Sequence, residues 1–451
     1  MEASAKALAS FYLPQPSYLA ALGNIHIITK KGVIMKSNYK LLTLAVLLAA
    51  TQAHATDGYF TPGYGVKSQG AGGVGYALPQ DSLTIATNPA GLSWVGDRLD
   101  IGATLFRPNR DAEITGSPSP GANGIYNAND QKNFIIPEFG YSKQVSPELS
   151  LGVAVYGNGG LNTNYDRAIP LLGSSQAKVD LIQLFVAPTV AWKFTPTQSL
   201  GVTLNLAYQR FTAKGLENFA NASFSQSPNN VTNKSFDQSY GAGLHFGWLG
   251  QFGDYVSLGA SYQTKTYTTK FDRYQGLFAE QGRFDIPATF GAGIAVKATP
   301  QLTLAGDVQR IQYSDVNSVG NSIANFLAGN LLGSDNGGGF GWKDVTVYKL
   351  GAVYAYDDKL TLRAGYNHSD QPIPSSETLF NILAPAVVQD HIAFGTTWKF
   401  ENKSELSFNY IHAFENTVNG SSTSIPSNFG GGAVNLKMYQ DSVGVAYSWA
   451  L

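Results

Sequence analysis

Three glycines near the start of the chain have the spacing of a phosphate-binding loop. Gly70, Gly72 and Gly75 form the pattern G-x-G-x-x-G within the stretch QGAGGVGY. Such a loop binds a pyrophosphate when it joins a buried strand to a helix and an acidic residue follows about 20 residues later. The preceding stretch TDGYFTPGYGV lacks the composition of a buried strand, and no acidic residue follows in a second strand. We therefore predict no nucleotide cofactor and interpret the glycines as allowing a tightly coiled segment.

Residues that could act as catalysts or metal ligands are few. The chain has no cysteine, which excludes disulfides, thiol nucleophiles and Cys-ligated zinc. It contains neither the G-x-S-x-G motif of serine hydrolases nor the H-E-x-x-H motif of zinc proteases. Asp390 and His391 are the nearest approach to an acid–base pair, but adjacent residues of a strand point to opposite faces. The sequence predicts no enzyme, no cofactor and no metal site.

The composition argues against a nucleic-acid partner and favours the cell envelope. The net charge is -1, and only 14% of the 451 residues are charged, against about 25% in soluble domains. A protein that binds nucleic acid would carry a basic surface. The absence of cysteine suits a chain that crosses an oxidising periplasm.

One apolar run has the features of an export signal. Residues 41–50, LLTLAVLLAA, are too few to span a membrane, which needs about 20 residues. Lys36 and Lys40 precede this run, and the small-residue pattern A-H-A follows it. These features predict a secretory signal peptide over residues 35–55, cleaved after Ala55.

Residues 1–34 have no place ahead of such a signal. The signal begins naturally at Met35, since a basic segment and then the apolar run follow it directly. We interpret residues 1–34 as an N-terminal extension that arises from a misassigned start codon.

From residue 98 onward the chain alternates large apolar with small or polar residues. At the C-terminus Val443, Val445 and Trp449 share one parity, whereas Ser442 and Ser448 share the other. Successive residues of a strand point to opposite faces, so each strand has one apolar and one polar face. A soluble sandwich would turn the apolar face inward, whereas a barrel in the outer membrane turns it toward lipid.

The spacing of turns and loops favours the membrane barrel. Six short polar turns recur, at 144–151, 194–200, 251–258, 297–304, 356–362 and 400–408. Seven longer stretches rich in Gly, Asn and Ser lie between them, at 107–133, 157–178, 212–234, 268–281, 314–344, 367–388 and 415–437. Together they connect fourteen strands, and bacterial outer-membrane barrels have even strand numbers, short periplasmic turns and long outer loops. The sequence predicts an all-β fold, a 14-stranded antiparallel transmembrane β-barrel over 98–451.

Residues 56–97 do not fit the strand pattern. They are rich in glycine and then carry PQDSLTIATNPAGL, in which Asp81 and Asn88-Pro89 are candidate helix starts. We expect this segment to fold inside the barrel as a hatch, or plug. Aromatic residues near the predicted strand ends suit the girdles at the membrane interfaces. These are Trp192, Phe194, Tyr354, Tyr356, Trp398, Phe400, Tyr447 and Trp449.

Three stretches resemble the FadL/TodX-type outer-membrane transporters of long-chain fatty acids and aromatic hydrocarbons. NPAGL, at Asn88, Pro89 and Ala90, is similar to the family's N-terminal hatch. IPEFGYSKQVSPELSLGVAVYGNGGLNTNY resembles its second and third strands, and GWKDVTVYKLGAVYAYDDKLTLRAGYNHSDQPIP its tenth and eleventh. The resemblance spans almost the whole mature chain and implies a 14-stranded barrel with a small hatch.

The resemblance also implies a mechanism. Outer loops capture a hydrophobic ligand, which enters a pocket inside the barrel and leaves when the hatch shifts and a kinked third strand opens sideways. The matching stretch here is Gly157, Asn158, Gly159 and Gly160, where glycines would bend a strand. A simple boundary between strand and loop would explain the same residues.

A fatty-acid ligand would need a cation for its carboxylate. The resemblance of YQRFTAKGLENF to a ligand-binding segment of the family falls on Arg210, although this residue shares the lipid-facing parity of Leu206 and Tyr208. Lys343 and Lys349 are the other candidates, and Lys349 has the parity of the lumen. Solvated charges inside the barrel are the alternative interpretation.

A neutral hydrocarbon would need no cation. Phe326 and Leu327 belong to the outer-loop stretch IANFLAGNLL at 323–332, which has the periodicity of a short helix and could contact such a ligand. The same apolar face would also suit packing on the barrel rim.

The sequence thus predicts a monomeric channel in the outer membrane of a Gram-negative cell, in contact with outer-membrane lipids. Its partner would be a hydrophobic small molecule, either a fatty acid or a hydrocarbon. A general diffusion porin is the first alternative, and an outer-membrane acyl hydrolase is a weaker one.

Overall fold

The computed structural model describes residues 57–451 of the chain. The predicted extension at 1–34 and the predicted signal peptide at 35–55, with cleavage after Ala55, lie outside the described residues. Within residues 57–451, no helix is both long and apolar enough to cross a membrane.

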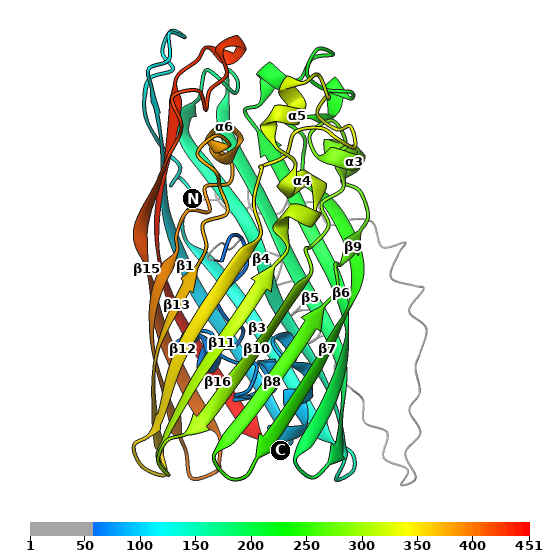
Figure 1. Ribbon diagram of the computed structural model, residues 1–451, viewed down its shortest axis with the longest axis vertical. Helices are drawn as coiled ribbons and strands as arrows, with labels where there is room; N and C mark the ends of the chain where they lie inside the picture. Colours follow the sequence, from blue (N-terminus) through cyan, green and yellow to red (C-terminus); the bar gives the residue numbers. More distant parts are fainter. Residues whose placement is uncertain (1–56) are drawn as a thin grey trace, which may run out of the picture. The chain divides into compact units, whose positions relative to one another are not determined.

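Across residues 57–451, fourteen antiparallel strands pair with their neighbours in chain order and close into a barrel through the pairing of β16 with β1 (Figure 1). The strands are β1 (Arg98–Thr115), β3 (Phe134–Gln144), β4 (Leu149–Ala168), β5 (Gln176–Thr195), β6 (Gln198–Lys214), β7 (Asp237–Phe252), β8 (Val256–Gln263), β10 (Thr289–Lys297), β11 (Leu302–Ile311), β12 (Val345–Ala355), β13 (Leu360–Ser369), β14 (Asp390–Lys399), β15 (Glu405–Asn419) and β16 (Ala433–Ala450). Two short strands lie outside this order: β2 (Gly124–Asn127) pairs with the end of β1, and β9 (Tyr267–Thr268) pairs with β7. The predicted 14-stranded all-β barrel is confirmed.

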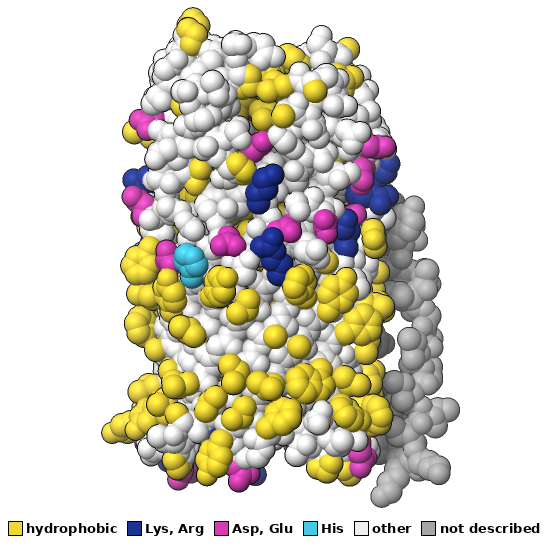
Figure 2. Space-filling view, viewed as in Figure 1, with side chains coloured by type: hydrophobic (Ala, Val, Ile, Leu, Met, Phe, Trp, Pro, Cys, Tyr) yellow, Lys and Arg dark blue, Asp and Glu magenta, His cyan; other side chains and the backbone are white. Residues whose placement is uncertain are grey.

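The alternation along the strands separates an apolar outer surface from a polar interior. In β16, Val443, Val445 and Trp449 are exposed on the outer surface, whereas Ser442 and Ser448 are buried. Figure 2 shows apolar side chains gathered around the lower half of the barrel, with charged side chains above and below. Closure is essential here, because lipid offers no hydrogen-bond partner to a free strand edge.

The two ends of the barrel differ. All six predicted turns join strands at one end, and the longer loops with their short helices crown the other (Figure 1). The helical turns of the loops are η4 (Glu217–Phe219), η5 (Pro228–Asn230), η6 (Asp272–Tyr274), α3 (Ala279–Gly282), η7 (Tyr313–Asp315), α4 (Asn317–Gly320), α5 (Ile323–Leu327), α6 (Thr378–Asn381) and η8 (Ser427–Phe429). The helix expected over 323–332 ends at Leu327, since Gly329 takes a positive φ just beyond it.

Several predicted loops are shorter than expected, since β1 continues to Thr115 and β16 begins at Ala433, and the loop predicted at 157–178 differs most. The sequence predicts a loop over 157–178, but β4 continues to Ala168 and β5 begins at Gln176, so that only a short connection separates them. The glycines at 157–160 therefore lie within a strand, which excludes the simple boundary between strand and loop.

Residues 57–97, here called the luminal segment, lie against inward-facing residues of the barrel wall. The segment contains α2 (Val66–Gly70), η2 (Ser82–Ala86) and η3 (Pro89–Trp94). Asp81 and Asn88 cap the last two helices, because their side chains accept hydrogen bonds from the backbone of Leu83 and Ala90. Both helix starts occur where the sequence predicts them.

Close contacts of the luminal segment with the barrel wall account for the three glycines of the G-x-G-x-x-G pattern. A Cβ on Gly70 would lie 2.8 Å from the Cα of Gly395 on β14, and a Cβ on Gly72 would lie 3.0 Å from the Cα of Gly365 on β13. The backbone N–H of Gly75 donates to Asp307 on β11 at 2.7 Å. These glycines bring the luminal segment into backbone contact with the wall, so their function is close packing.

Candidate functional site

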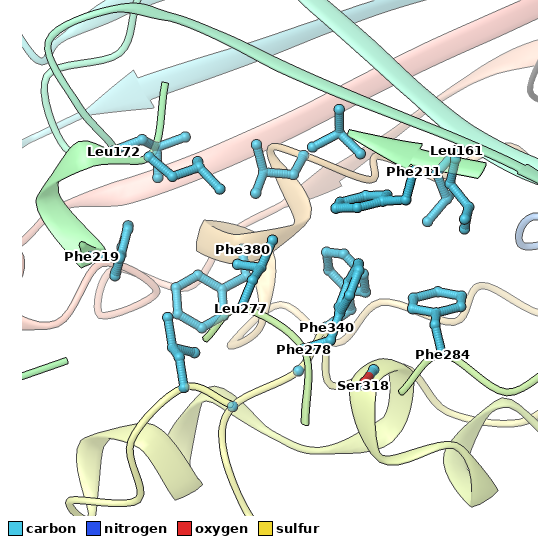
Figure 3. A pocket seen from close by; sticks show the side chains of 17 residues that line it. Leu161, Leu172, Phe211, Phe219, Leu277, Phe278, Phe284, Ser318, Phe340 and Phe380 are labelled. Atoms are coloured by element: carbon cyan, nitrogen blue, oxygen red, sulfur yellow. The ribbon is translucent and has the colours of Figure 1, made fainter. Parts of the chain in front are cut away.

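An apolar cavity of about 50 Å³ lies beneath the outer loops (Figure 3). The upper parts of β4, β5 and β6 form one side, and segments of five outer loops form the other. Its lining comprises Leu161, Leu172, Val179, Leu181, Phe211, Leu216, Phe219, Leu277, Phe278, Phe284, Ser318, Leu332, Gly338, Gly339, Phe340, Phe380 and Leu383.

The lining carries almost no hydrogen-bonding capacity. None of the described residues that line the cavity is charged, and Ser318 is the one that has a polar side chain. Its hydroxyl donates to the backbone oxygen of Arg283 at 2.5 Å. Such a site favours apolar ligands, because burying a polar group without a hydrogen bond is unfavourable.

Five phenylalanines from four outer loops form a cluster above the cavity. Phe219 and Phe380 also line the cavity, and their ring centroids are 5.6 Å apart. Phe326 packs on both of them, at 6.2 and 5.9 Å, so it lies one ring behind the cavity wall. Phe224 and Phe429 complete the cluster, with ring centroids 5.4 Å apart. The next residue in α5, Leu327, is exposed and does not belong to the described lining.

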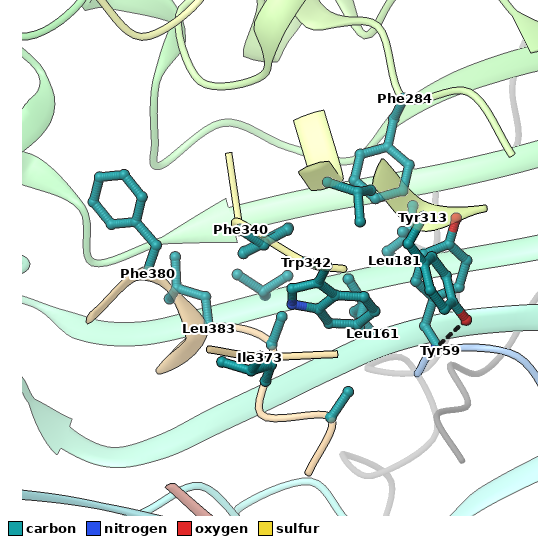
Figure 4. Packing of buried hydrophobic residues seen from close by; sticks show 14 of the residues in the cluster. Tyr59, Leu161, Leu181, Phe284, Tyr313, Phe340, Trp342, Ile373, Phe380 and Leu383 are labelled. Carbon is teal, nitrogen blue, oxygen red and sulfur yellow. Dashed lines mark hydrogen bonds between the residues drawn. The ribbon is translucent and has the colours of Figure 1, made fainter. Parts of the chain in front are cut away.

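Aromatic residues also close the cavity toward the luminal segment. Figure 4 shows Tyr59 of that segment beside Tyr313 and Trp342, with Phe284 close by. The ring of Tyr59 lies 5.0 Å from that of Tyr313, 5.8 Å from that of Trp342 and 6.1 Å from that of Phe284. The N–H of Tyr59 donates to the hydroxyl of Tyr313 at 3.1 Å. The luminal segment therefore contacts the cavity wall directly.

A bulge in β4 turns the cavity residues of this strand inward. The register with β5 shifts between Gly157 and Gly159, so one extra residue reverses the alternation. Below the bulge Leu151 faces outward, but Leu161, which shares its parity, lines the cavity. Above the bulge the hydroxyl of Tyr165 donates to the backbone oxygen of Ile382 at 2.6 Å, inside the barrel.

The bulge coincides with a gap in the barrel wall. Pairing between β3 and β4 ends at Glu138 and Tyr156, whereas the pairing of β4 with β5 continues beyond it. Beyond that point, the β3 side of β4 meets the luminal segment, through a bridge between Gly159 and Phe60, and then Asn129, through a bridge at Asn164. The sequence predicts a kink over Gly157, Asn158, Gly159 and Gly160, and these residues lie at the lower end of this gap.

The three cations predicted to bind a carboxylate do not line the cavity. Arg210 has the outward parity of its strand, and its guanidinium stacks on the ring of Phe236 at 4.2 Å. Lys343 is exposed. Lys349 does face the lumen, where its ammonium donates to the backbone oxygen of Pro62 at 2.6 Å and to Gln309 at 3.0 Å. The structure brings none of these cations together.

Asn88, Pro89 and Ala90 fix the luminal segment to β6 and β7. The amide of Asn88 donates to the backbone oxygens of Tyr76, at 2.6 Å, and Trp248, at 2.9 Å. A Cβ on Gly247 would lie 2.9 Å from the Cδ of Pro89, so this contact requires a glycine in the wall. The three residues lie far from the cavity lining and anchor the segment instead.

Partly buried ion pairs form a second anchor. Lys67 of α2 pairs with Glu405 on β15, which also pairs with Arg98 on β1 at 3.3 Å. The N–H of Ser82 donates to Asp100 at 3.0 Å. These contacts bind the luminal segment to the strands around the closure of the barrel.

A carboxylate in the outer loops holds the cavity rim together. Glu217 accepts hydrogen bonds from Ser175, from Asn233 at 2.6 Å and from the N–H of Ser174 at 3.0 Å. Burial acts to raise the pKa of Glu217, but the hydrogen bonds from Ser175 and Asn233 outweigh it and lower the pKa to about 2. The loop that supplies Leu216 and Phe219 is thereby tied to the connection between β4 and β5.

The candidate acid–base pair does not form. Asp390 faces outward and hydrogen-bonds His368 at 2.8 Å, whereas His391 is buried on the inner side of β14. Among residues 57–451, no group of three His, Asp or Glu side chains is placed to hold a metal ion.

Sequence reasoning missed most of the cavity. Phe278 and Phe284 lie in the loop between β9 and β10, and Leu172 lies in the connection between β4 and β5. The sequence feature that could have identified these lining residues is the presence of large apolar residues in loop stretches otherwise rich in Gly, Asn and Ser. Leu161 gives no such signal, since its parity alone places it toward lipid.

The fold and the site define a membrane-spanning barrel with an apolar cavity inside its outer end and a segment of its own chain below. Residues 46–449 match the family described as outer membrane protein transport protein (OMPP1/FadL/TodX), and the chain belongs to this family. No curated protein sequence matches the chain significantly.

Solved structures share the fold at low sequence identity. The toluene transporter TodX of Pseudomonas putida is 19% identical, with a TM-score of 0.63 over 88% of this chain and 100% of that chain. The toluene transporter TbuX of Ralstonia pickettii is 18% identical, with a TM-score of 0.60 over 86% and 98%. A FadL homologue of Pseudomonas aeruginosa is 14% identical, with a TM-score of 0.62 over 87% and 98%.

Proposed function

We propose that the protein is a channel for the passive uptake of hydrophobic compounds across the outer membrane of a Gram-negative cell. The observation that carries this proposal is the cavity, an apolar site beneath the longer loops at one end of the barrel. Membership of a family of outer-membrane transport proteins supports it.

The lining favours a neutral hydrocarbon over a fatty acid. A carboxylate transferred into this cavity would lose its hydration and find no cation among the described lining residues. Six phenylalanines line the cavity, and their rings suit aromatic ligands, which prefer offset or edge-to-face contacts. Two of the similar solved structures are those of toluene transporters, so toluene is a suitable first ligand.

The proposed route has three stages. The phenylalanine cluster above the cavity captures the ligand, the cavity binds it, and residues 56–97 act as a hatch that must shift before release. Tyr59 couples the last two stages, because it contacts the cavity residue Phe284 and its backbone oxygen accepts from the N–H of Gly160 at 3.1 Å. A ligand that displaces Tyr59 would loosen β4 at the gap, and the ligand would leave sideways into the membrane between β3 and β4.

The domain boundaries that accompany this proposal follow the sequence. Residues 35–55 would direct export and be cleaved after Ala55, and residues 1–34 would not be translated. Residues 98–451 would form a monomeric barrel in contact with outer-membrane lipids. Mass spectrometry of the purified mature protein tests the cleavage site directly.

Equilibrium binding to the purified protein tests the ligand class. We expect toluene to bind and dodecanoate to bind at least about tenfold more weakly, because burying an unpaired carboxylate is unfavourable. Preferential binding of dodecanoate would overturn the assignment of a neutral ligand and favour a fatty-acid channel.

The alternative functions predict other outcomes. A general diffusion porin would pass small sugars in liposome-swelling assays. In this protein we expect the luminal segment to block small sugars. An acyl hydrolase would release fatty acid from phospholipid, and we expect no release.

A further inference from the structure

The gap between β3 and β4 leaves one edge of β4 without a neighbouring strand. In an antiparallel strand, alternate residues direct their N–H and C=O groups to opposite neighbours. Between Tyr156 and Asn164, the groups of β4 that point toward β3 do not pair with β3, and one isolated bridge joins Gly159 to Phe60 of the luminal segment. Lipid cannot satisfy these groups, so a closed wall needs other hydrogen-bond partners at this edge.

Two hydrogen bonds, made by Gly160 and Asn162 of β4, replace the pairing with the missing strand. The N–H of Gly160 donates to the backbone oxygen of Tyr59, which belongs to the luminal segment. The backbone oxygen of Asn162 accepts from the guanidinium of Arg110, which comes from β1. The same guanidinium donates to the backbone oxygen of Gln131 at 2.7 Å. Arg110 therefore bridges β4 to the segment that leads into β3.

Arg110 is an unusual residue for this position. Its side chain is 3% exposed, and its guanidinium lies 5.9 Å from the ring of Phe134. The hydrogen-bond acceptors that it meets among the described residues are neutral oxygens of Asn162 and Gln131. A buried cation is normally paired with a carboxylate. A planar group with several donors does suit two carbonyl oxygens that belong to different segments.

We propose that Arg110 is the latch of the lateral opening, the side chain that holds β4 against the segment before β3 while the cavity is empty. This inference rests on the proposed lateral route for a hydrophobic ligand. Tyr59 contacts the cavity wall and responds to the ligand, whereas Arg110 is not among the described lining residues. Arg110 therefore sets how readily the wall opens, and it does not set how tightly the cavity binds its ligand.

The test separates rate from affinity. Initial uptake of labelled toluene is measured in intact Gram-negative cells that produce equal amounts of each variant, and toluene affinity is measured on the purified proteins. We expect Arg110→Leu to raise uptake at least fivefold and to leave the toluene affinity within twofold of the wild type. Arg110→Lys keeps the charge, but one nitrogen cannot bridge both oxygens, so its uptake should lie between the two.

Arg107→Leu is the matched control. Arg107 lies three residues earlier on β1 and is exposed on the outer surface, so its loss should leave both quantities unchanged. If Arg110→Leu does not fold, the raised uptake of Arg110→Lys carries the test. The latch would be overturned if the folded Arg110 variants took up toluene at the wild-type rate. It would also be overturned if these variants bound toluene or dodecanoate more weakly than the wild type does. Wild-type protein that takes up no toluene would instead contradict the proposed function.

Discussion

Replacing Gly159 by alanine tests whether the contact between the luminal segment and β4 keeps the channel closed. A Cβ at this position would overlap the backbone oxygen of Tyr59, and a backbone atom has no alternative rotamer. Relief of the overlap requires Tyr59 to move away from the strand. That movement breaks the hydrogen bond of 3.1 Å between the N–H of Gly160 and the oxygen of Tyr59.

The size of the effect follows from this one hydrogen bond. A buried N–H that loses its acceptor raises the free energy of the closed state by about 1–3 kcal/mol. A change of this size shifts the equilibrium toward the open state by about 5- to 150-fold. We therefore expect the initial rate of toluene uptake by intact cells to rise by at least about fivefold in Gly159→Ala.

Gly306→Ala provides the matched control. Gly306 also lies within a strand, β11, and a Cβ there would make ordinary van der Waals contacts with the side chain of Leu350, at 3.4 Å, and the backbone oxygen of Lys349, at 3.7 Å. Its uptake should equal that of the wild type. A folded Gly159→Ala barrel with unchanged or slower uptake would refute the reasoning.

Three further changes test the anchors, the cavity and the rim. Glu405→Gln leaves the buried ammonium of Lys67 without its nearest carboxylate, a loss that costs about 3–5 kcal/mol. Amide hydrogen exchange in α2 should therefore accelerate at least about 100-fold. Unchanged exchange would contradict the role of this ion pair as an anchor. Phe211→Ala removes one ring from the cavity and should weaken toluene binding by about 2- to 12-fold in equilibrium titrations, whereas equal affinity would place the ligand elsewhere. The pKa of Glu217 is depressed, so its contribution to stability is complete above its ordinary pKa of 4.5 and is lost as the pH falls through about 2. Glu217→Gln should accordingly lower the Tm at neutral pH, and the difference in Tm from the wild type should shrink as the pH falls below 4.5. A difference in Tm that does not change with pH would contradict the role of the Glu217 carboxylate in holding the loops together.

The barrel was predictable because its rules are local. Alternation assigns each residue of a regular strand to lipid or lumen, so the inward position of Lys349 and the outward position of Val443 follow from parity alone. Short turns and long loops then give the strand number. The helix starts at Asp81 and Asn88 were equally local, because a capping side chain contacts its own first turn.

The site was less predictable because it depends on contacts between distant segments. One inserted residue reverses the parity of β4, so the inward position of Leu161 cannot be read from the alternation. Arg210 illustrates the opposite case, since its parity correctly indicated the outer surface while family resemblance suggested a ligand contact. The cavity itself joins five loops, and no periodicity within a loop shows which of its side chains will meet those of another.

The glycine spacing shows where local rules mislead. Gly70 and Gly72 have the spacing of a nucleotide loop, but each meets a glycine on the facing barrel wall. The sequence pattern that explains these glycines is divided between the luminal segment and strands roughly 300 residues away. In those strands, inward-facing glycines such as Gly365 and Gly395 leave room for the backbone of the luminal segment.

Uptake of labelled toluene by intact Gram-negative cells, with and without this protein in the outer membrane, tests the central claim most directly. The account predicts faster initial uptake when the protein is present, competition by other neutral aromatic compounds and no acceleration for small sugars. Toluene uptake equal to that of cells without the protein, or acceleration of sugar uptake alone, would contradict it.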